Sequence, residues 1–185
     1  MQKCKTSPFW WVALMCVLLF GCSGKSRTPK DSEEATLSKL SMIRSHHRRA
    51  AISLKLGHRE RAIEEMDKII KISFPKSFRA GKEAIWDAWA RKAMMQMEGK
   101  QVRQALTTID TVIASLTPAD ISFYTAHLYH VRGRILEEIG QPQEALNAYQ
   151  RSIEINKKVI AVEKKKKKIQ TGVPHKRPRL HRRAP

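Results

Sequence analysis

The chain has 185 residues and a formal net charge of +19 at pH 7, from 36 Lys and Arg against 17 Asp and Glu. This length fits one domain with extensions and excludes a large two-domain enzyme, because domains usually contain about 100–200 residues. Three cysteines exclude a disulfide framework. Eight glycines and eight prolines are few for a β-sandwich or a collagen-like chain.

Residues 1–21 have the pattern of an export signal. Lys3 and Lys5 precede an uncharged apolar run from Phe9 to Phe20, which is too short for a membrane-spanning helix of about twenty residues. The run ends in Leu19-Phe20-Gly21-Cys22. This junction resembles the lipobox of bacterial lipoproteins, which has a leucine three residues before the cysteine and a small residue directly before it.

The lipobox resemblance implies that Cys22 carries a lipid on its thiol, that the chain is cut before it, and that the new amino group is acylated. Several acyl chains anchor a protein far more firmly than one chain does. In that family a residue other than Asp after the cysteine, here Ser23, usually directs the protein to the outer membrane. We therefore expect a lipid-anchored envelope protein that faces the periplasm. An ordinary cleaved signal peptide or a short uncleaved anchor is the alternative.

The rest of the chain divides into three parts. Residues 22–32 are polar and turn-rich and are expected to form a tether. Residues 33–168 show helical periodicity without the sustained alternation that is typical of strands. Residues 169–185 are expected to form a disordered basic tail. From Lys157 to Pro185 the chain has twelve Lys or Arg and one acid, a charge of +11.

Three ten-residue blocks in the helical part align with one another. They begin at Arg61, Gln104 and Glu144, and in each an alanine is followed by a large aliphatic residue and, four and eight positions after the alanine, by apolar or aromatic residues. Ser152 stands in the third block where the other two have an aliphatic residue. The alanines are 43 and 40 residues apart. Each block is predicted to be the second helix of a pair and to pack its small alanine face on the first helix.

The first helices are predicted over residues 35–56, 79–98 and 118–139, where apolar residues recur at helical spacing. Between the helices, Gly57 and Gly140 suit helix ends that need a left-handed residue. Pro142 suits a first helical turn. The segment Thr117-Pro118-Ala119-Asp120 resembles a capping box with Asp in place of Glu.

The blocks and their preceding helices resemble the tetratricopeptide repeat, which has small residues at positions 8 and 20 and an aromatic residue at position 24. Counted from Ala126, the third unit has Gly133, Ala145 and Tyr149 at these positions. The first unit counts from Ile43. Lys100 occupies position 15 of the second unit, which counts from Trp86.

This resemblance implies an all-α fold, a short α-solenoid of about three helical hairpins. Its units lie at about 43–76, 86–119 and 126–159. The spacings of 40 and 43 residues exceed the family period of about 34 and imply longer helices or connectors. A generic antiparallel helical bundle is the alternative.

The sequence contains no motif for a metalloprotease, a phosphate-binding loop or a serine nucleophile. His127 and His130 lie three residues apart on one predicted helix face but lack a convincing third metal ligand. The adjacent His46 and His47 point to different helix faces. We therefore expect a binding module without metal or cofactor, and not an enzyme.

By the repeat resemblance, the first helices line a concave groove at fixed repeat positions. The candidate partner-binding residues at these positions are Arg44, His47, Leu54, Met94, Met97, His127, His130 and Arg134. Methionines suit adaptable contacts with peptides, although both could equally belong to the core. We expect an adaptor or scaffold with an unidentified protein or peptide partner.

The basic tail supports a second interpretation, a structural envelope protein that bridges the membrane or cell-wall polymers while the repeats act as a spacer. Anionic lipids or cell-wall polymers are its expected partners. The tail has no interleaved aromatic residues for base stacking, and export would separate the chain from nucleic acid. No nucleic-acid partner is therefore expected.

Overall fold

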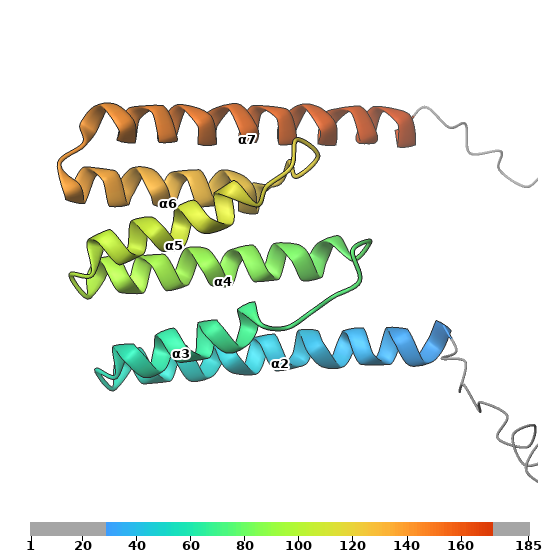
Figure 1. Ribbon diagram of the computed structural model, residues 1–185. Coiled ribbons are helices and arrows are strands. Elements are labelled where there is room, and N and C mark those ends of the chain that lie inside the picture. The colour runs from blue at the N-terminus through green and yellow to red at the C-terminus, as the bar shows by residue number, and fades with distance from the viewer. Residues whose placement is uncertain (1–28, 172–185) are drawn as a thin grey trace, which may run out of the picture. The chain divides into compact units, whose positions relative to one another are not determined.

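A computed structural model describes the protein over residues 29–171, which form six α-helices and contain no β-strand. The helices are α2 (Pro29–Lys55), α3 (Arg59–Ile70), α4 (Arg79–Glu98), α5 (Val102–Ala114), α6 (Phe123–Ile139) and α7 (Pro142–Thr171). From Thr36 onward they belong to one compact unit, in which successive helices pair as antiparallel hairpins (Figure 1). The predicted all-α short solenoid is confirmed. The proposed signal and lipobox, and the tail beyond Thr171, lie outside the described residues.

Several helix ends follow the predictions and two extend beyond them. The helix predicted over 79–98 coincides with α4, and α7 begins at Pro142 as expected. α2 begins at Pro29, so the last four residues of the expected tether are helical. Proline suits this position, because its missing N–H needs no partner in a first turn. α7 continues to Thr171, three residues beyond the predicted end of the repeat domain.

The start of α6 differs from the prediction. The capping box is formed by Ser122 and Thr125: the Thr125 N–H donates to Ser122 Oγ at 3.2 Å, and the Ser122 N–H donates to Thr125 Oγ1 at 3.0 Å. The predicted box at Thr117–Asp120 is instead a turn. Asp120 Oδ2 accepts from the Thr117 N–H at 2.8 Å, and its Oδ1 accepts from Lys82 Nζ at 2.6 Å. These bonds close the turn, so α6 starts only at Phe123.

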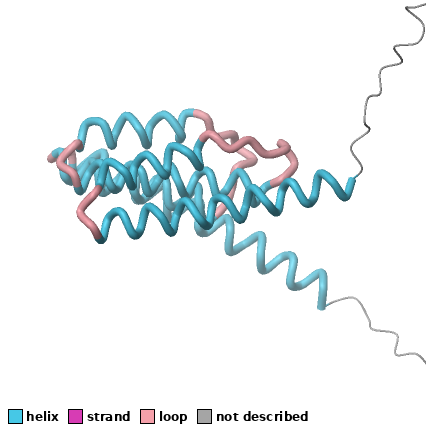
Figure 2. The backbone as a smooth tube through the Cα atoms, turned by 90° about the horizontal axis from the view of Figure 1, so that it is seen from below, coloured by secondary structure: helices cyan, strands magenta, loops and turns pink. Residues whose placement is uncertain are grey.

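The two helices of every hairpin are joined by the same backbone turn. Gly57, Lys100 and Gly140 all have left-handed φ angles, of 77°, 65° and 80°. The N–H of each donates to the carbonyl three residues back, and the next N–H donates to the carbonyl five residues before it. This is the Schellman arrangement, which satisfies two of the free carbonyls at a helix end. The short turns gather at one end of the unit and the longer connectors, 71–78 and 115–122, at the other (Figure 2).

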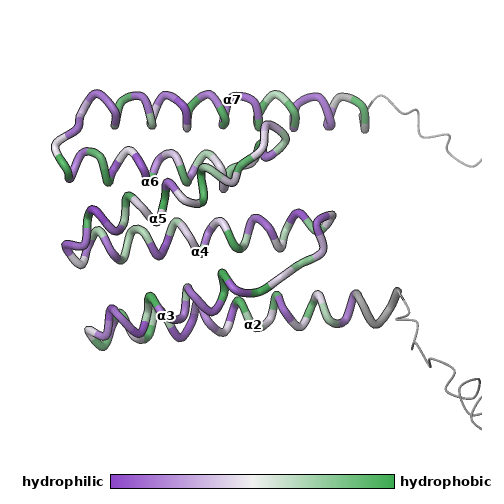
Figure 3. The backbone as a smooth tube through the Cα atoms, viewed as in Figure 1, coloured by the Kyte–Doolittle hydropathy of each residue, from purple (hydrophilic) through white to green (hydrophobic). Residues whose placement is uncertain are grey.

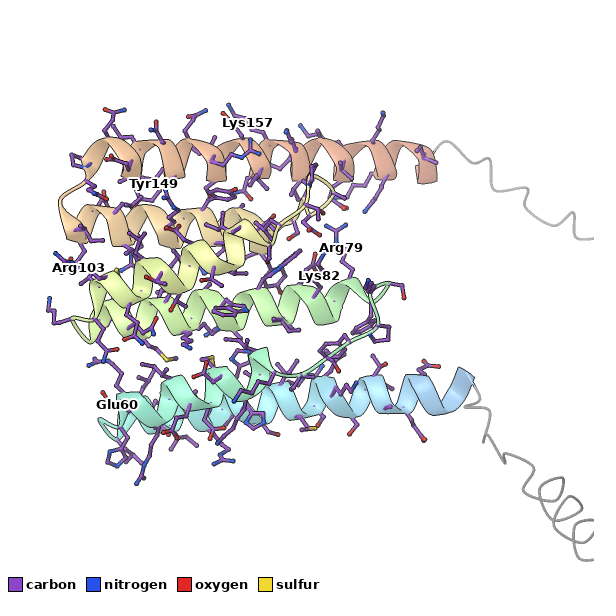
Figure 4. All side chains as sticks on the ribbon, viewed as in Figure 1. Glu60, Arg79, Lys82, Arg103, Tyr149 and Lys157 are labelled. Atoms are coloured by element: carbon purple, nitrogen blue, oxygen red, sulfur yellow. The ribbon has the colours of Figure 1, made fainter. Side chains whose placement is uncertain are left out.

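Small residues bring the paired helices together. Ala62, Ala105 and Ala145 are at most 2% exposed, as predicted for the contact face of the second helices. Gly133 is buried on α6 beneath the ring of Tyr149, where an added Cβ would lie 2.6 Å from a ring carbon. Tyr149 lies between α6 and α7 (Figure 4). Gly133 and Tyr149, at repeat positions 8 and 24, therefore pack together as a small and a large residue.

Polar Ser152 is accommodated by a hydrogen bond. It is 7% exposed and donates from Oγ to the backbone carbonyl of Ala126 on α6 at 2.8 Å. A buried hydroxyl with a partner avoids the cost of an unsatisfied polar group. The aliphatic residue of the other two units is thus replaced by a polar link between α6 and α7.

Two hydrophobic clusters connect the hairpins through α4. One joins α2 and α3 to Ala88 and Met95 on one side of α4, and the other joins α5 and α6 to Ala90 and Ala93 on another side. α4 is consequently covered by neighbours from all three hairpins. This packing holds the first helices α2, α4 and α6 in fixed relation and positions the surface described below.

Lys100→Gly is expected to stabilise the fold. A left-handed conformation costs a non-glycine residue about 1–2 kcal/mol, while glycine loses about 0.5–1 kcal/mol through its greater freedom in the unfolded chain. The lost ion pair from Lys100 Nζ to Glu138 Oε1, at 3.3 Å between two exposed side chains, contributes little. We expect the free energy of unfolding to rise by about 0.5–1 kcal/mol in urea titrations followed by circular dichroism.

The matched control is Lys100→Ala, which removes the same ion pair but keeps a Cβ in the left-handed position. This variant should show no gain. Equal stability of the glycine and alanine variants would contradict the assignment of a strained turn at Lys100.

Candidate partner-binding groove

An open hollow of about 330 Å³ lies where the first helices of all three hairpins meet. Its lining residues are Leu54 of α2, Asp87, Arg91, Met94, Met95 and Glu98 of α4, and His127 of α6. The leucine and the two methionines supply its apolar surface, and the charged and imidazole side chains supply its polar groups. A surface of this kind can bury an apolar side chain of a partner while it orients the partner through polar contacts.

The predicted groove residues are distributed unevenly around this hollow. Leu54, Met94 and His127 line it. Met97 is 8% exposed, belongs to the core cluster with α5 and α6, and does not line the hollow. The remaining predicted residues lie on α2 or α6 without lining the hollow: Arg44, His47, His130 and Arg134. Met95 and Arg91 line the hollow although neither was predicted.

Asp87 links the polar groups of the hollow. Its Oδ2 accepts a hydrogen bond from Arg91 Nε at 2.6 Å, one helical turn along α4. The same oxygen lies 3.7 Å from Nε2 of His47 on α2. One carboxylate thus connects the first hairpin to the second. Arg91 was missed because the groove residues were assigned from fixed repeat positions that do not include it, although its spacing from Asp87 and Met94 places it on the same face of α4.

Two half-buried histidines, His127 in the hollow and His47 beside Asp87, favour the neutral form. Burial lowers the pKa of His47 below 6.5, the charge of Arg91 lowers it further, and Asp87 opposes them. Burial also lowers the pKa of His127, with Asp87 again opposing and His130 adding to the decrease. A neutral imidazole offers one hydrogen-bond donor and one acceptor. Near pH 7 these side chains therefore present polar but uncharged contacts to a partner.

A row of rings continues from the hollow along α6. The rings of Phe123 and His127 stack with centroids 6.1 Å apart, and those of His127 and His130 follow at 6.2 Å. His130 then contacts Tyr149 on α7, with centroids 5.4 Å apart. Burial and the hydrogen bond that its hydroxyl donates to Glu137 at 2.7 Å raise the pKa of Tyr149 to about 12. The row provides aromatic contact area beside the hollow for side chains of a partner.

His46 faces away from this groove, as predicted from its position next to His47. Its Nδ1 lies 2.6 Å from Oε2 of Glu65 on α3, a carboxylate that is 4% exposed. Lys68 Nζ and Arg49 Nη2 approach the other oxygen at 2.8 and 3.0 Å. Burial alone would raise the pKa of Glu65, but the hydrogen bonds from Lys68 and His46 outweigh it and lower that pKa. This cluster ties α2 to α3 and was not foreseen from the sequence.

Neither a metal-binding cluster nor a helix able to cross a membrane occurs in the described part of the chain. No three His, Cys, Asp or Glu side chains in this range are grouped so that they could hold a metal ion. No helix in the same range combines the length and the apolar character that crossing a bilayer requires.

The profile of the tetratricopeptide repeat family matches residues 43–75 and 126–159. Tetratricopeptide repeats are thus detected at two stretches of the chain. The two matches coincide with the predicted first and third units. The second unit has the same hairpin and turn but is not matched, and it carries Lys100 where the others have glycine. No curated protein and no solved structure matches the chain.

Acidification is expected to destabilise the fold through His47 and His127. Both pKa values are lowered from 6.5, so just below that pH the unfolded chain binds more protons than the folded chain. Stability therefore falls as the pH drops through this window. The variant His47→Gln/His127→Gln should show a weaker decrease of Tm between about pH 7.5 and about pH 5.

His58→Gln provides the control, because it removes an exposed imidazole, whereas His47 and His127 are half-buried. It should keep the pH dependence of the parent protein. The same dependence in the double histidine variant would show that these two imidazoles do not account for it.

Proposed function

We propose that this protein is an adaptor of the bacterial envelope that holds a protein or peptide partner against α2, α4 and α6. The observation that carries the proposal is the hollow to which all three first helices contribute side chains. Tetratricopeptide repeats typically bind proteins and are typically not enzymes, which supports a binding module over a catalyst. The proposal includes no cofactor and no metal.

The chemistry of the groove indicates the kind of segment it accepts. Met94 and Leu54 line the hollow, and the flexible methionine can adapt to an aliphatic or aromatic side chain of the partner. Arg91 and the neutral His127 supply hydrogen-bond donors beside this apolar surface. A short segment with one large apolar residue flanked by backbone or carboxylate acceptors would satisfy both. The exposed ring of Phe123 would extend the contact along α6.

We further propose that Cys22 is lipidated and holds the repeats at the outer membrane, facing the periplasm. The Leu-Phe-Gly-Cys junction after a short apolar run supports this anchor. With Cys4 and Cys16 removed with the signal, no thiol would remain free. A signal peptide, a lipid modification and a membrane location belong to the same proposal.

The alternative function is a structural one, in which the basic C-terminal segment bridges the membrane or anionic cell-wall polymers. The charge of +11 from Lys157 to Pro185 supports it. The two functions differ in which part of the chain captures the partner, so position-specific crosslinking can separate them.

Photo-crosslinking from the groove tests the adaptor function. A benzophenone amino acid is placed at Leu54 or Met94, in the hollow, or at Gln104, an exposed residue of α5 outside it. In a bacterium with two membranes, the two groove positions should yield the same discrete crosslinked protein. Gln104 should yield little of it. Equal yields at all three positions would contradict groove binding.

Two further chains complete this experiment. Truncation after Glu163 should leave the groove crosslink intact, and its loss would favour the structural alternative. Cys22→Ala should block lipidation and leave a precursor about 2 kDa heavier by mass spectrometry, since residues 1–21 are retained. Maturation of that variant to the normal mass would contradict the proposed anchor.

A further inference from the structure

α7 extends well past the helix on which it packs. The bond from Ser152 to the Ala126 carbonyl lies near the first turn of α6, which starts at Phe123. α7 nevertheless remains helical to Thr171. With a rise of about 1.5 Å per residue, residues 160–171 extend about 18 Å. The last three turns therefore have no antiparallel partner helix within the described residues.

An apolar stripe follows α7 from its packed part into this extension. Ile155 is 7% exposed and Val159 is partly buried, whereas Val162 and Ile169 on the same side are 46% and 68% exposed. The spacings of four, three and seven residues keep these side chains on one face of a helix. An open hollow of about 590 Å³ borders Val159 and Val162, with the 62% exposed ring of Phe123 at the same place. Arg79 and Glu83 of α4 line the same hollow, so the stripe is partly covered at Val162 and continues past this cover to Ile169.

Lysines occupy much of the rest of this helix surface, together with the 54% exposed Ile160. From Lys157 to Lys168 the sequence has seven lysines and only Glu163 as an acid, a charge of +6. Lys164 and Lys165 are exposed on sides away from the stripe. Lys157 projects from the side of α7 opposite α6 (Figure 4). Isolated hydrophobic turns alternate with hydrophilic ones along this part of α7 (Figure 3).

We propose that residues 157–169 of α7 form an interfacial helix that binds an anionic lipid surface. Val162 and Ile169 enter the boundary between headgroups and acyl chains, while the lysines contact the phosphates. Lys166, which lies on the stripe and pairs with Glu163 at 2.9 Å, extends its alkyl chain along the apolar side and its ammonium to the headgroups. This inference rests on neither the groove nor the lipidation of Cys22.

The charge and width of the two faces favour a lipid surface over a protein. The exposed stripe holds few aliphatic side chains and is interrupted by Lys166. Such a stripe is too narrow for a stable contact with another helix. Lysines surround more than half of the helix, which suits the diffuse negative charge of a membrane leaflet. A second copy of the chain would bring another +6 against this segment. Homodimerisation through α7 is therefore disfavoured.

Site-directed spin labels on the full chain test this inference locally. Cys4, Cys16 and Cys22 are replaced by serine, and a label is attached at Val162→Cys, Ile169→Cys or Lys164→Cys. The vesicles are phosphatidylcholine alone or with about 30% phosphatidylglycerol. With the anionic vesicles, the labels at 162 and 169 should become accessible to oxygen at a depth of about 5–10 Å. The label at 164 should stay in water, as should all labels with neutral vesicles.

A matched pair of charge variants tests where the attraction arises. Replacement of Lys157, Lys158, Lys164 and Lys165 by Gln should lower the lipid-embedded fraction of the label at 162 by about 10-fold or more. The control removes the same charge from exposed residues outside α7 by replacing Lys55, Arg61, Lys71 and Lys76 with Gln. Its effect should be below about 3-fold, because distant charges are screened.

Either of two results would overturn the inference. Labels at 162 and 169 that stay in water on anionic vesicles would exclude insertion, and their immobilisation by an acidic protein would then assign the face to a protein partner. Equal losses in the two charge variants would show that the whole basic chain, and not α7, is attracted. Attachment of the chain to vesicles through residues 1–21 would affect all the labelled chains equally. The spin labels report only whether α7 itself enters the lipid.

Discussion

The close approach of two helices within each hairpin is the constraint on which the rest of this structure depends. Ala62, Ala105 and Ala145 are almost fully buried where the second helices meet the first. The left-handed turn between the helices sets their register. Its hydrogen bonds are the same in all three hairpins. Once each helix pair is fixed, α4 packs against two hydrophobic clusters that lie on different sides of it. The shared surface of α2, α4 and α6, with its hollow, follows from that arrangement.

Much of the fold could be predicted because it depends on local and periodic signals. Self-alignment of the alanine blocks located the second helices, and Gly57 and Gly140 marked two of the three turns. The third turn was placed by register alone, since lysine does not signal a left-handed residue. The start of α6 was misplaced because Asp120 binds Lys82, which is distant in sequence. A long-range bond of this kind leaves no periodic trace.

The candidate site was less predictable than the fold. Repeat positions indicated Leu54, Met94 and His127, since each position corresponds to a helix face. They did not separate Met97, which a neighbouring hairpin covers, from Met95, which also lines the hollow. Nor did they indicate the buried Glu65, whose charge is tolerated only because three cationic or polar side chains from two helices converge on it. Sequence periodicity indicates which residues share a helix face. Tertiary packing decides which of them a neighbouring helix buries.

A double-mutant cycle on Gly133 and Tyr149 tests the hairpin constraint most directly. An added Cβ at Gly133 would lie 2.6 Å from the Tyr149 ring, and such overpacking costs about 1–3 kcal/mol. Without that ring, alanine stabilises a helix interior by about 0.5–1 kcal/mol relative to glycine. Gly133→Ala should therefore lower the free energy of unfolding in the natural chain and raise it in the Tyr149→Ala background. A change of the same sign and size in both backgrounds would contradict the account.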